Sequence, residues 1–121
     1  MSKKTLVLGA STSTYRYSNI AVRRLLAKGH EVYLLGKSKG MVAGHKINRQ
    51  WPSLNDDIHT ITVYLAPSNQ KEYYEQIEQC TAQRIIFNPG SENKELKEIA
   101  DKSGKEVLEA CTLVMLNSAQ Y

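Results

Sequence analysis

Residues 9–18 combine side chains and backbone groups that bind phosphate in many proteins. The segment reads GASTSTYRYS, so Ser and Thr hydroxyls, one guanidinium and two phenols follow a single glycine. Ser18 or Asn19 can cap a helix that begins here. The free N–H groups and the dipole of a helix N-terminus attract phosphate. The segment therefore predicts a loop that binds a pyrophosphate.

A second candidate phosphate contact lies at residues 36–40, which read GKSKG. An NAD site places an acidic residue at this point and carries G-x-G-x-x-G in the first loop. Here Ser11 and Thr14 occupy the second and third glycine positions of that motif. Lys37 and Lys39 instead suit an additional phosphate, such as the 3′-phosphate of coenzyme A or the 2′-phosphate of NADP. The alternative is that both are solvated loop lysines.

Short apolar runs alternate with amphipathic segments along the chain. The runs predict strands and the amphipathic segments predict helices. The sequence thus predicts an α/β fold: a single Rossmann-like doubly wound domain, residues 1–121, with a mainly parallel five-stranded sheet. The predicted strands are Thr5–Gly9, Glu31–Gly36, Thr60–Leu65, Arg84–Phe87 and Glu106–Glu109; the predicted helices are Ser18 to the stop at Gly29, Asn69–Cys80, Glu92–Lys102 and a short one within 112–121.

Residues 37–59 are rich in turn formers and are not assigned beyond one weak strand at His45–Ile47. Trp51 is interpreted as an anchor for this irregular segment. Tyr73 and Tyr74 are interpreted as helix residues that pack on the sheet. Ligands of open α/β sheets lie beyond the carboxyl ends of the strands, so the loops that follow the predicted strands are the expected site.

Composition excludes several classes of protein. With 41% hydrophobic and 23% charged residues, the chain is an ordinary globular protein rather than a disordered or fibrous one. Residues 1–60 hold ten Lys/Arg against three Asp/Glu, and residues 61–121 hold six against nine. The basic residues are scattered, so nucleic-acid binding is not expected. We find no signal peptide, membrane span or metal-binding motif and expect a cytoplasmic protein.

The ordered set of loop motifs resembles the family of small stand-alone CoA-binding domain proteins. It is also similar, more distantly, to the nucleotide-binding domain at the start of the succinyl-CoA synthetase α subunit. The motifs are GASTSTYRYS, GKSKG, LAP at 65–67, NPG at 88–90 and EACT at 109–112.

This resemblance implies that the chain binds coenzyme A or an acyl-CoA. It places the pyrophosphate in the first loop, the phosphorylated end of the coenzyme at Lys37, the adenine against residues 65–67 and the pantetheine arm near residues 88–90. Pro89 departs from the synthetase, which has an acidic residue there. The candidate cofactor-binding residues are Gly9, Ser11, Thr12, Tyr15, Arg16, Tyr17, Ser18, Gly36, Lys37, Lys39, Leu65, Ala66, Pro67, Asn88, Pro89, Gly90 and Cys111.

Cys111 follows the last predicted strand, where synthetase-like domains also carry a cysteine. It is a candidate partner for the coenzyme's thiol in a mixed disulfide, and the alternative is a small buried hydrophobic residue. His30, His45 and His59 lie away from the predicted carboxyl ends and are interpreted as structural or solvated. The chain ends after the part that resembles the first synthetase domain. We therefore expect coenzyme binding without catalysis, as in a sensor or carrier.

Two other functions stay open at this point. A small NADP-dependent reductase would bind the 2′-phosphate of NADP through Lys37 and Lys39. The sequence places no proton donor for such an enzyme. A protein-interaction module with an unused nucleotide pocket would instead bind a second copy of the chain or an unknown protein partner.

Overall fold

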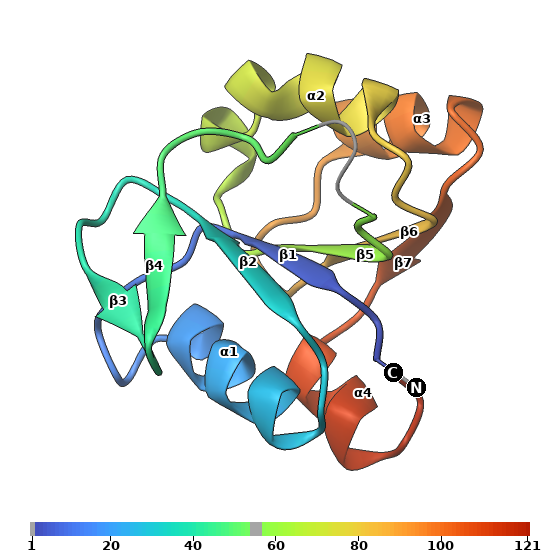
Figure 1. The fold of residues 1–121 in the computed structure, drawn as a ribbon. Helices are drawn as coiled ribbons and strands as arrows, with labels where there is room; N and C mark the ends of the chain where they lie inside the picture. The colour runs from blue at the N-terminus through green and yellow to red at the C-terminus, as the bar shows by residue number, and fades with distance from the viewer. Residues whose placement is uncertain (1, 54–56) are drawn as a thin grey trace.

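A single sheet runs through the middle of the molecule and places β1 between strands from different parts of the chain (Figure 1). The structure is a computed structural model that describes residues 2–53 and 57–121. The described residues form seven strands in the order β3-β4-β2-β1-β5-β6-β7, all pairs parallel except β3 with β4. The strands are β1 (Thr5–Leu8), β2 (Val32–Leu35), β3 (Met41–Val42), β4 (His45–Asn48), β5 (Thr60–Val63), β6 (Arg84–Phe87) and β7 (Glu106–Glu109).

Helices cover both faces of the sheet. Helices α1 (Tyr17–Ala27) and α4 (Thr112–Asn117) cover one face, and α2 (Tyr74–Gln79) and α3 (Lys94–Lys102) cover the other (Figure 1). Successive strand residues point to opposite faces. Leu6 and Leu8 therefore pack with α2 and α3, whereas Val7 packs with α1 and α4. The predicted α/β fold with a mainly parallel sheet is thus confirmed.

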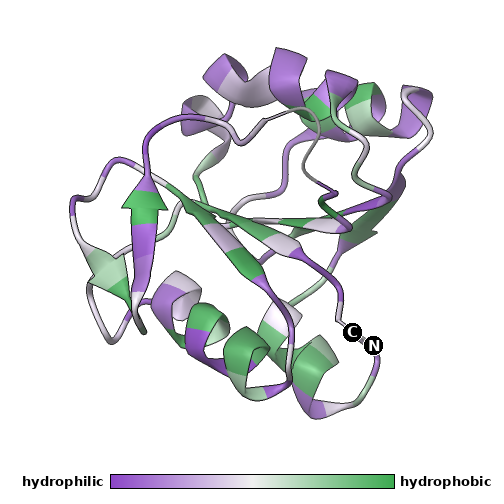
Figure 2. Cartoon of the chain, in the orientation of Figure 1, coloured by the Kyte–Doolittle hydropathy of each residue, from purple (hydrophilic) through white to green (hydrophobic). Residues whose placement is uncertain are grey.

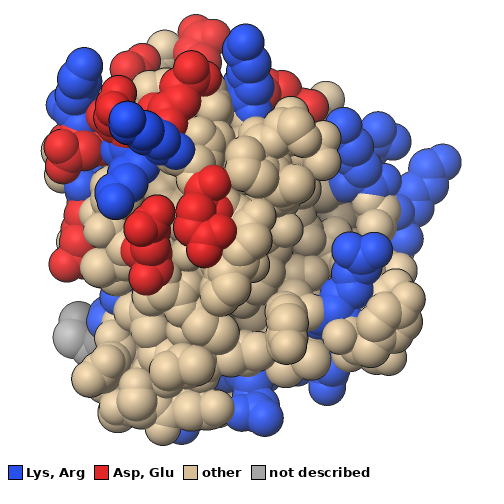
Figure 3. Space-filling view, turned by 180° about the vertical axis from the view of Figure 1, so that it is seen from behind, with Lys and Arg blue, Asp and Glu red and all other residues tan. Residues whose placement is uncertain are grey.

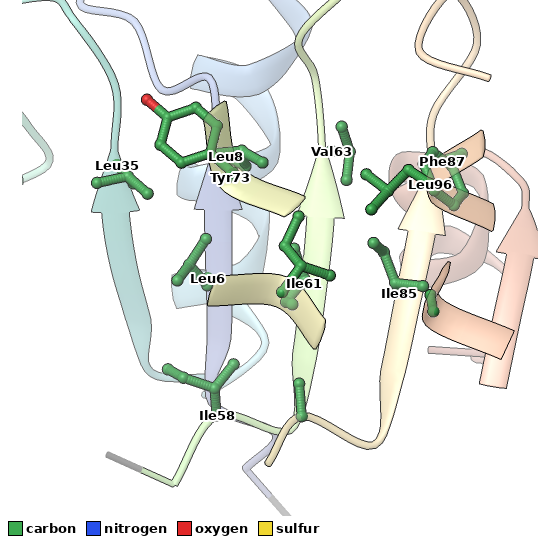
Figure 4. Close-up of a cluster of buried hydrophobic side chains, with 13 residues drawn as sticks. Leu6, Leu8, Leu35, Ile58, Ile61, Val63, Tyr73, Ile85, Phe87 and Leu96 are labelled. Carbon is green, nitrogen blue, oxygen red and sulfur yellow. The ribbon is translucent and has the colours of Figure 1, made fainter. Parts of the chain in front are cut away.

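The central strands are hydrophobic on both faces, as the short apolar runs of the sequence predict. Figure 2 shows hydrophobic residues on these strands and polar residues on the outer sides of the helices. Figure 4 shows Leu6, Ile61 and Ile85 side by side on β1, β5 and β6, below a second row that contains Val63 and Phe87. These rows fix the register of the three strands, and hence the positions of the loops that follow them.

The expectation of five strands is wrong, because residues 41–48 form a hairpin. Strands β3 and β4 pair around Ala43 and Gly44, whose φ angles are 50° and 84°. Positive φ at both positions defines the two-residue turn that usually carries Asn-Gly. Strand β4 then extends the sheet by pairing in parallel with β2. The weak strand predicted at His45–Ile47 exists as β4, and β3 was not predicted.

The predicted helix Asn69–Cys80 is also wrong in its first half. Two 3₁₀ turns, η1 (Pro67–Asn69) and η2 (Lys71–Tyr73), precede the short helix α2. Gln70 lies between them and is fully buried. Its side-chain amide donates hydrogen bonds to the Leu65 and Ser91 carbonyl oxygens, each over 2.8 Å. The segment thereby joins the loops that follow β5 and β6.

A cluster of cationic and aromatic side chains closes the amino ends of the strands. Tyr121 is only 8% exposed there, and its hydroxyl is hydrogen-bonded to Thr5. The ring centroid lies 4.4 Å from the Arg84 guanidinium carbon and 5.0 Å from the centroid of the His30 ring. The side chains of Lys3 and Arg84 both donate to the carbonyl oxygen of Tyr121. Protonation of a histidine in this cluster would add a further positive charge.

Burial, reinforced by Lys3 and Arg84, lowers the pKa of both His30 and His59 below the ordinary value of 6.5. As the pH falls, the unfolded chain therefore binds these protons before the folded chain does. The contribution of the two neutral histidines to the free energy of unfolding is full above pH 6.5 and is lost as the pH falls through the folded pKa values. We expect the melting temperature to fall between about pH 7.5 and about pH 5.5.

The His30→Asn/His59→Asn double variant should show a smaller fall over the same range, measured by circular dichroism. His45→Asn, in the exposed hairpin, is the matched control and should keep the wild-type slope. An undiminished fall in the double variant would show that other groups cause it.

Candidate functional site

Residues 9–16, which follow β1, are held in place by hydrogen bonds from two directions. The Gly9 and Ala10 N–H groups donate to the carbonyl oxygen of Leu35, at the end of β2, over 2.8 and 3.1 Å. From helix α1, the Asn19 amide donates to the Ser11 carbonyl oxygen over 2.9 Å. Arg23 donates to the Thr14 carbonyl oxygen and to the Asn19 side chain. The loop is therefore held in place by hydrogen bonds within the protein.

Two glycines allow the loops after β1, β2 and β5 to meet. A Cβ atom on Gly36 would lie 2.7 Å from the Ala10 carbonyl oxygen, closer than side chains tolerate. Gly9 has a φ of 99°, and a Cβ atom there would lie 3.1 Å from the Leu65 side chain. Both residues were predicted to contact the cofactor. The structure shows that both have a packing role, because the absence of a side chain lets the loops approach each other.

Helix α1 begins at Tyr17, with Arg16 as its N-cap residue, and no side chain of the described residues caps it. The prediction that Ser18 or Asn19 caps this helix is therefore wrong. Ser18 is buried in the first turn, and the Asn19 side chain is engaged with Ser11 and Arg23. Without a side-chain cap, the first N–H groups of the helix are available to an anion.

These loops surround a depression of about 530 Å³, here called the central cleft. Backbone and hydroxyl groups of the first loop form one side, and residues after β2 and β5 form the other. Lys37 is the one lysine of its lining and lies 3.5 Å from the exposed carboxylate of Glu72. Seven predicted site residues line this cleft: Gly9, Ser11, Thr12, Arg16, Gly36, Lys37 and Leu65.

Five further residues line the central cleft without having been predicted: Ala10, Ser13, Ser38, Asn69 and Tyr73. The first three are neighbours of predicted residues. Tyr73 was predicted to pack on the sheet, and its ring does pack over Leu8. Its hydroxyl, however, points away from the core toward the carboxyl ends of the strands (Figure 4). Asn19 and Arg23 were also missed; their spacing of four residues on the helix behind the loop was the available signal.

A smaller pocket of about 330 Å³ adjoins the central cleft and is here called the tyrosine pocket. Gly9 and Arg16 line both, and Tyr15, Tyr17, Ser18 and Pro89 line the pocket as predicted site residues. Tyr64, the residue after β5, forms the rest of its lining. Burial raises the pKa of Tyr64, so its hydroxyl stays protonated at neutral pH.

The remaining predicted residues lie outside both depressions. Lys39 lines a separate groove beside β4. Asn88 is buried, and its side chain bonds to Thr62, Val63 and the N–H of Thr112, which braces β5, β6 and α4. Cys111 is half-buried as the N-cap residue of α4, near Tyr64. Ala66, Pro67 and Gly90 are exposed at the surface of their turns.

The described residues contain no group of three or more His, Cys, Asp and Glu side chains that could hold a metal ion. Within the same residues, no helix is long and apolar enough to span a membrane. His30 and His59 lie toward the amino ends of the strands, where their Nδ1 atoms bond to Lys3 and Thr60.

The fold and the cleft together define an α/β domain that offers backbone N–H groups and hydroxyls to an anionic ligand. The family model described as CoA binding domain matches residues 3–117. The chain therefore belongs to the CoA binding domain family, which confirms the family that its sequence resembles.

Solved structures agree with this assignment. A crystal structure of an uncharacterized protein is 42% identical over all of this chain and 99% of its own, with a TM-score of 0.95. A hypothetical protein from Pyrococcus horikoshii OT3 is 27% identical over 96% of this chain and 82% of its own, with a TM-score of 0.84. A conserved hypothetical protein from Pyrococcus furiosus is 28% identical over 94% of this chain and 98% of its own, with a TM-score of 0.79. A search of curated proteins finds no match.

Replacing Asn19 by alanine should release the first loop, because it removes the donor to Ser11 and the acceptor for Arg23. We expect a loss of about 1–3 kcal/mol in the free energy of unfolding, since two hydrogen bonds of a buried side chain are lost. Amide hydrogen exchange in residues 11–16 should become faster. Asn117→Ala removes an exposed bond to Arg24 and is the control. Equal effects of the two variants would contradict a role for Asn19 in holding the loop.

Proposed function

We propose that this protein binds coenzyme A or an acyl-CoA without transforming it. The pyrophosphate lies in the central cleft, against the loop after β1 and the N-terminus of α1. The observation that supports this most strongly is the uncapped start of α1, which faces a loop of hydroxyl and backbone groups in a chain of the CoA binding domain family. Fixed N–H groups at such a site are suited to an anion because they need no reorganisation when it binds.

The side chains around the two depressions favour binding over catalysis. Burial raises the pKa of Tyr64 and of Tyr73, so neither phenol serves as a base at neutral pH. The charged residues that line the central cleft are Arg16 and Lys37, and Lys37 forms an ion pair with Glu72 in which both side chains are largely exposed to solvent. Exposed cations and hydroxyls bind phosphate groups but supply no activated nucleophile.

The tyrosine pocket gives the pantetheine arm an open path. Tyr15 and Tyr17 are 82% and 72% exposed, while the half-buried Tyr64 forms the inner wall. An arm that leaves the pyrophosphate along this pocket keeps its thiol or acyl end accessible from solution. A sensor or carrier of acyl-CoA requires such access, whereas an enzyme usually encloses the reacting end.

Calorimetric titration tests the ligand. CoA and acetyl-CoA should bind with similar affinity and should raise the melting temperature as concentration increases. NADPH, NADH and ATP, at equal concentration, are the controls and should give smaller shifts. Stabilisation by NADPH alone would favour the reductase, and no shift with any of the five would refute nucleotide binding and favour a protein-interaction module.

Cys111 provides a test of where the thiol end lies. CoA disulfide should exchange with the Cys111 thiol, forming a Cys111–CoA disulfide and releasing one CoA thiol, so that the protein gains one CoA mass that a reductant removes. Cys111→Ser should abolish the adduct. Cys80 is equally half-buried but lies at the end of α2, and Cys80→Ser should leave the adduct unchanged. Labelling of Cys80, of both thiols or of neither would show that the arm does not reach Cys111.

A further inference from the structure

A third depression, of about 730 Å³, lies beside the central cleft and is here called the basic groove. Strands β2 and β4 form its floor, and the segment after β4 forms its wall. The residues that characterise it are Lys39, Lys46, Arg49, Tyr33 and Trp51. All of these except Tyr33 lie within residues 37–53, for which the sequence predicted only one weak strand.

Among the described residues, no carboxylate forms an ion pair with the cations of the basic groove. Residues 37–53 contain four Lys or Arg and no Asp or Glu. Lys39, Lys46 and Arg49 are exposed. Seen from behind, acidic side chains gather with some basic ones on the side of α2 and α3, whereas basic side chains predominate on the opposite side (Figure 3). Three exposed cations around one hollow favour an anionic ligand.

The basic groove begins where the central cleft ends. Ser38 lines both. Gly40, in the groove, packs against Thr12 of the first loop so closely that a Cβ atom would lie 2.9 Å from the Thr12 methyl group. Trp51 of the groove and Tyr73 of the cleft have ring centroids 6.4 Å apart. A ligand seated on the first loop can therefore extend past β2 into the groove.

We propose that the basic groove binds an ionised phosphate on the nucleoside end of the coenzyme, and so selects CoA over forms that lack the 3′-phosphate. This inference rests on the proposed function. Lys39, Lys46 and Arg49 are the specificity-determining residues. Lys37, to which the family resemblance assigns this end, has Glu72 at 3.5 Å, and that carboxylate would repel a dianionic phosphate. The groove offers the same phosphate three cations, and its described lining contains no carboxylate.

The test compares CoA with dephospho-CoA by calorimetry on three variants of the full chain. The wild type should bind CoA about ten- to hundredfold more tightly than dephospho-CoA. In Lys46→Gln/Arg49→Gln, the affinity for CoA should fall until the two ligands bind within about threefold of each other. Lys37→Gln should weaken both ligands by the same factor. Lys102→Gln removes an exposed lysine in the last turn of α3 and should change neither affinity.

These outcomes separate the two proposals. If the wild type binds neither ligand, the proposed function itself fails. If it binds CoA and the double variant keeps the full preference for it, the groove does not hold the phosphate and only this inference fails. Loss of the preference in Lys37→Gln instead would place the phosphate in the central cleft. The substituted side chains are exposed, and an unchanged melting temperature without ligand verifies that each variant folds.

Discussion

The close contact between the ends of β1 and β2 is the constraint on which the site depends. The Leu35 carbonyl oxygen accepts hydrogen bonds from two successive N–H groups, those of Gly9 and Ala10. This turn is possible because Gly36 has no side chain to collide with the Ala10 carbonyl oxygen. The order in which strands are added to the sheet reverses at β1, since β2 lies on one side of it and β5 on the other. In open α/β sheets such a reversal opens a crevice at the carboxyl ends, here occupied by the central cleft.

Three buried side-chain amides extend this constraint to the other loops. Asn19 holds the first loop to α1, Gln70 joins the loops after β5 and β6, and Asn88 joins β5 and β6 to α4. Each uses its donors or acceptor on backbone groups that would otherwise lack partners in the interior. The loops that carry the site are therefore braced by side chains that need not touch a ligand. Asn88 illustrates the consequence: it stands in a loop motif, yet its polar atoms are bonded within the protein.

The sequence predicted the parallel core and the first loop because both follow local rules. Buried strands such as Thr5–Leu8 are continuous apolar runs, and a polar loop between strand and helix needs no long-range information. The hairpin was missed because its turn is Ala43-Gly44 rather than Asn-Gly, and β3 has only two residues. The helix after β5 was predicted too long because Gln70 bonds through its side chain to the carbonyl oxygen of Ser91, 21 residues away in the sequence. Tertiary contacts of this kind leave no periodic pattern.

The missed hairpin also explains why the site looked smaller in the sequence than in the structure. Scattered lysines and arginines between residues 37 and 53 read as solvated charges when each is considered alone. Parallel pairing of β4 with β2 places Lys46 on the same face of the sheet as Tyr33, and Arg49 and Trp51 follow directly beside the central cleft. Five of the ten Lys and Arg side chains in residues 1–60 therefore line two adjoining hollows: Arg16, Lys37, Lys39, Lys46 and Arg49. In the proposed complex, a ligand with several phosphates would supply the negative charge, and the uncapped helix would supply N–H groups that bind one of them.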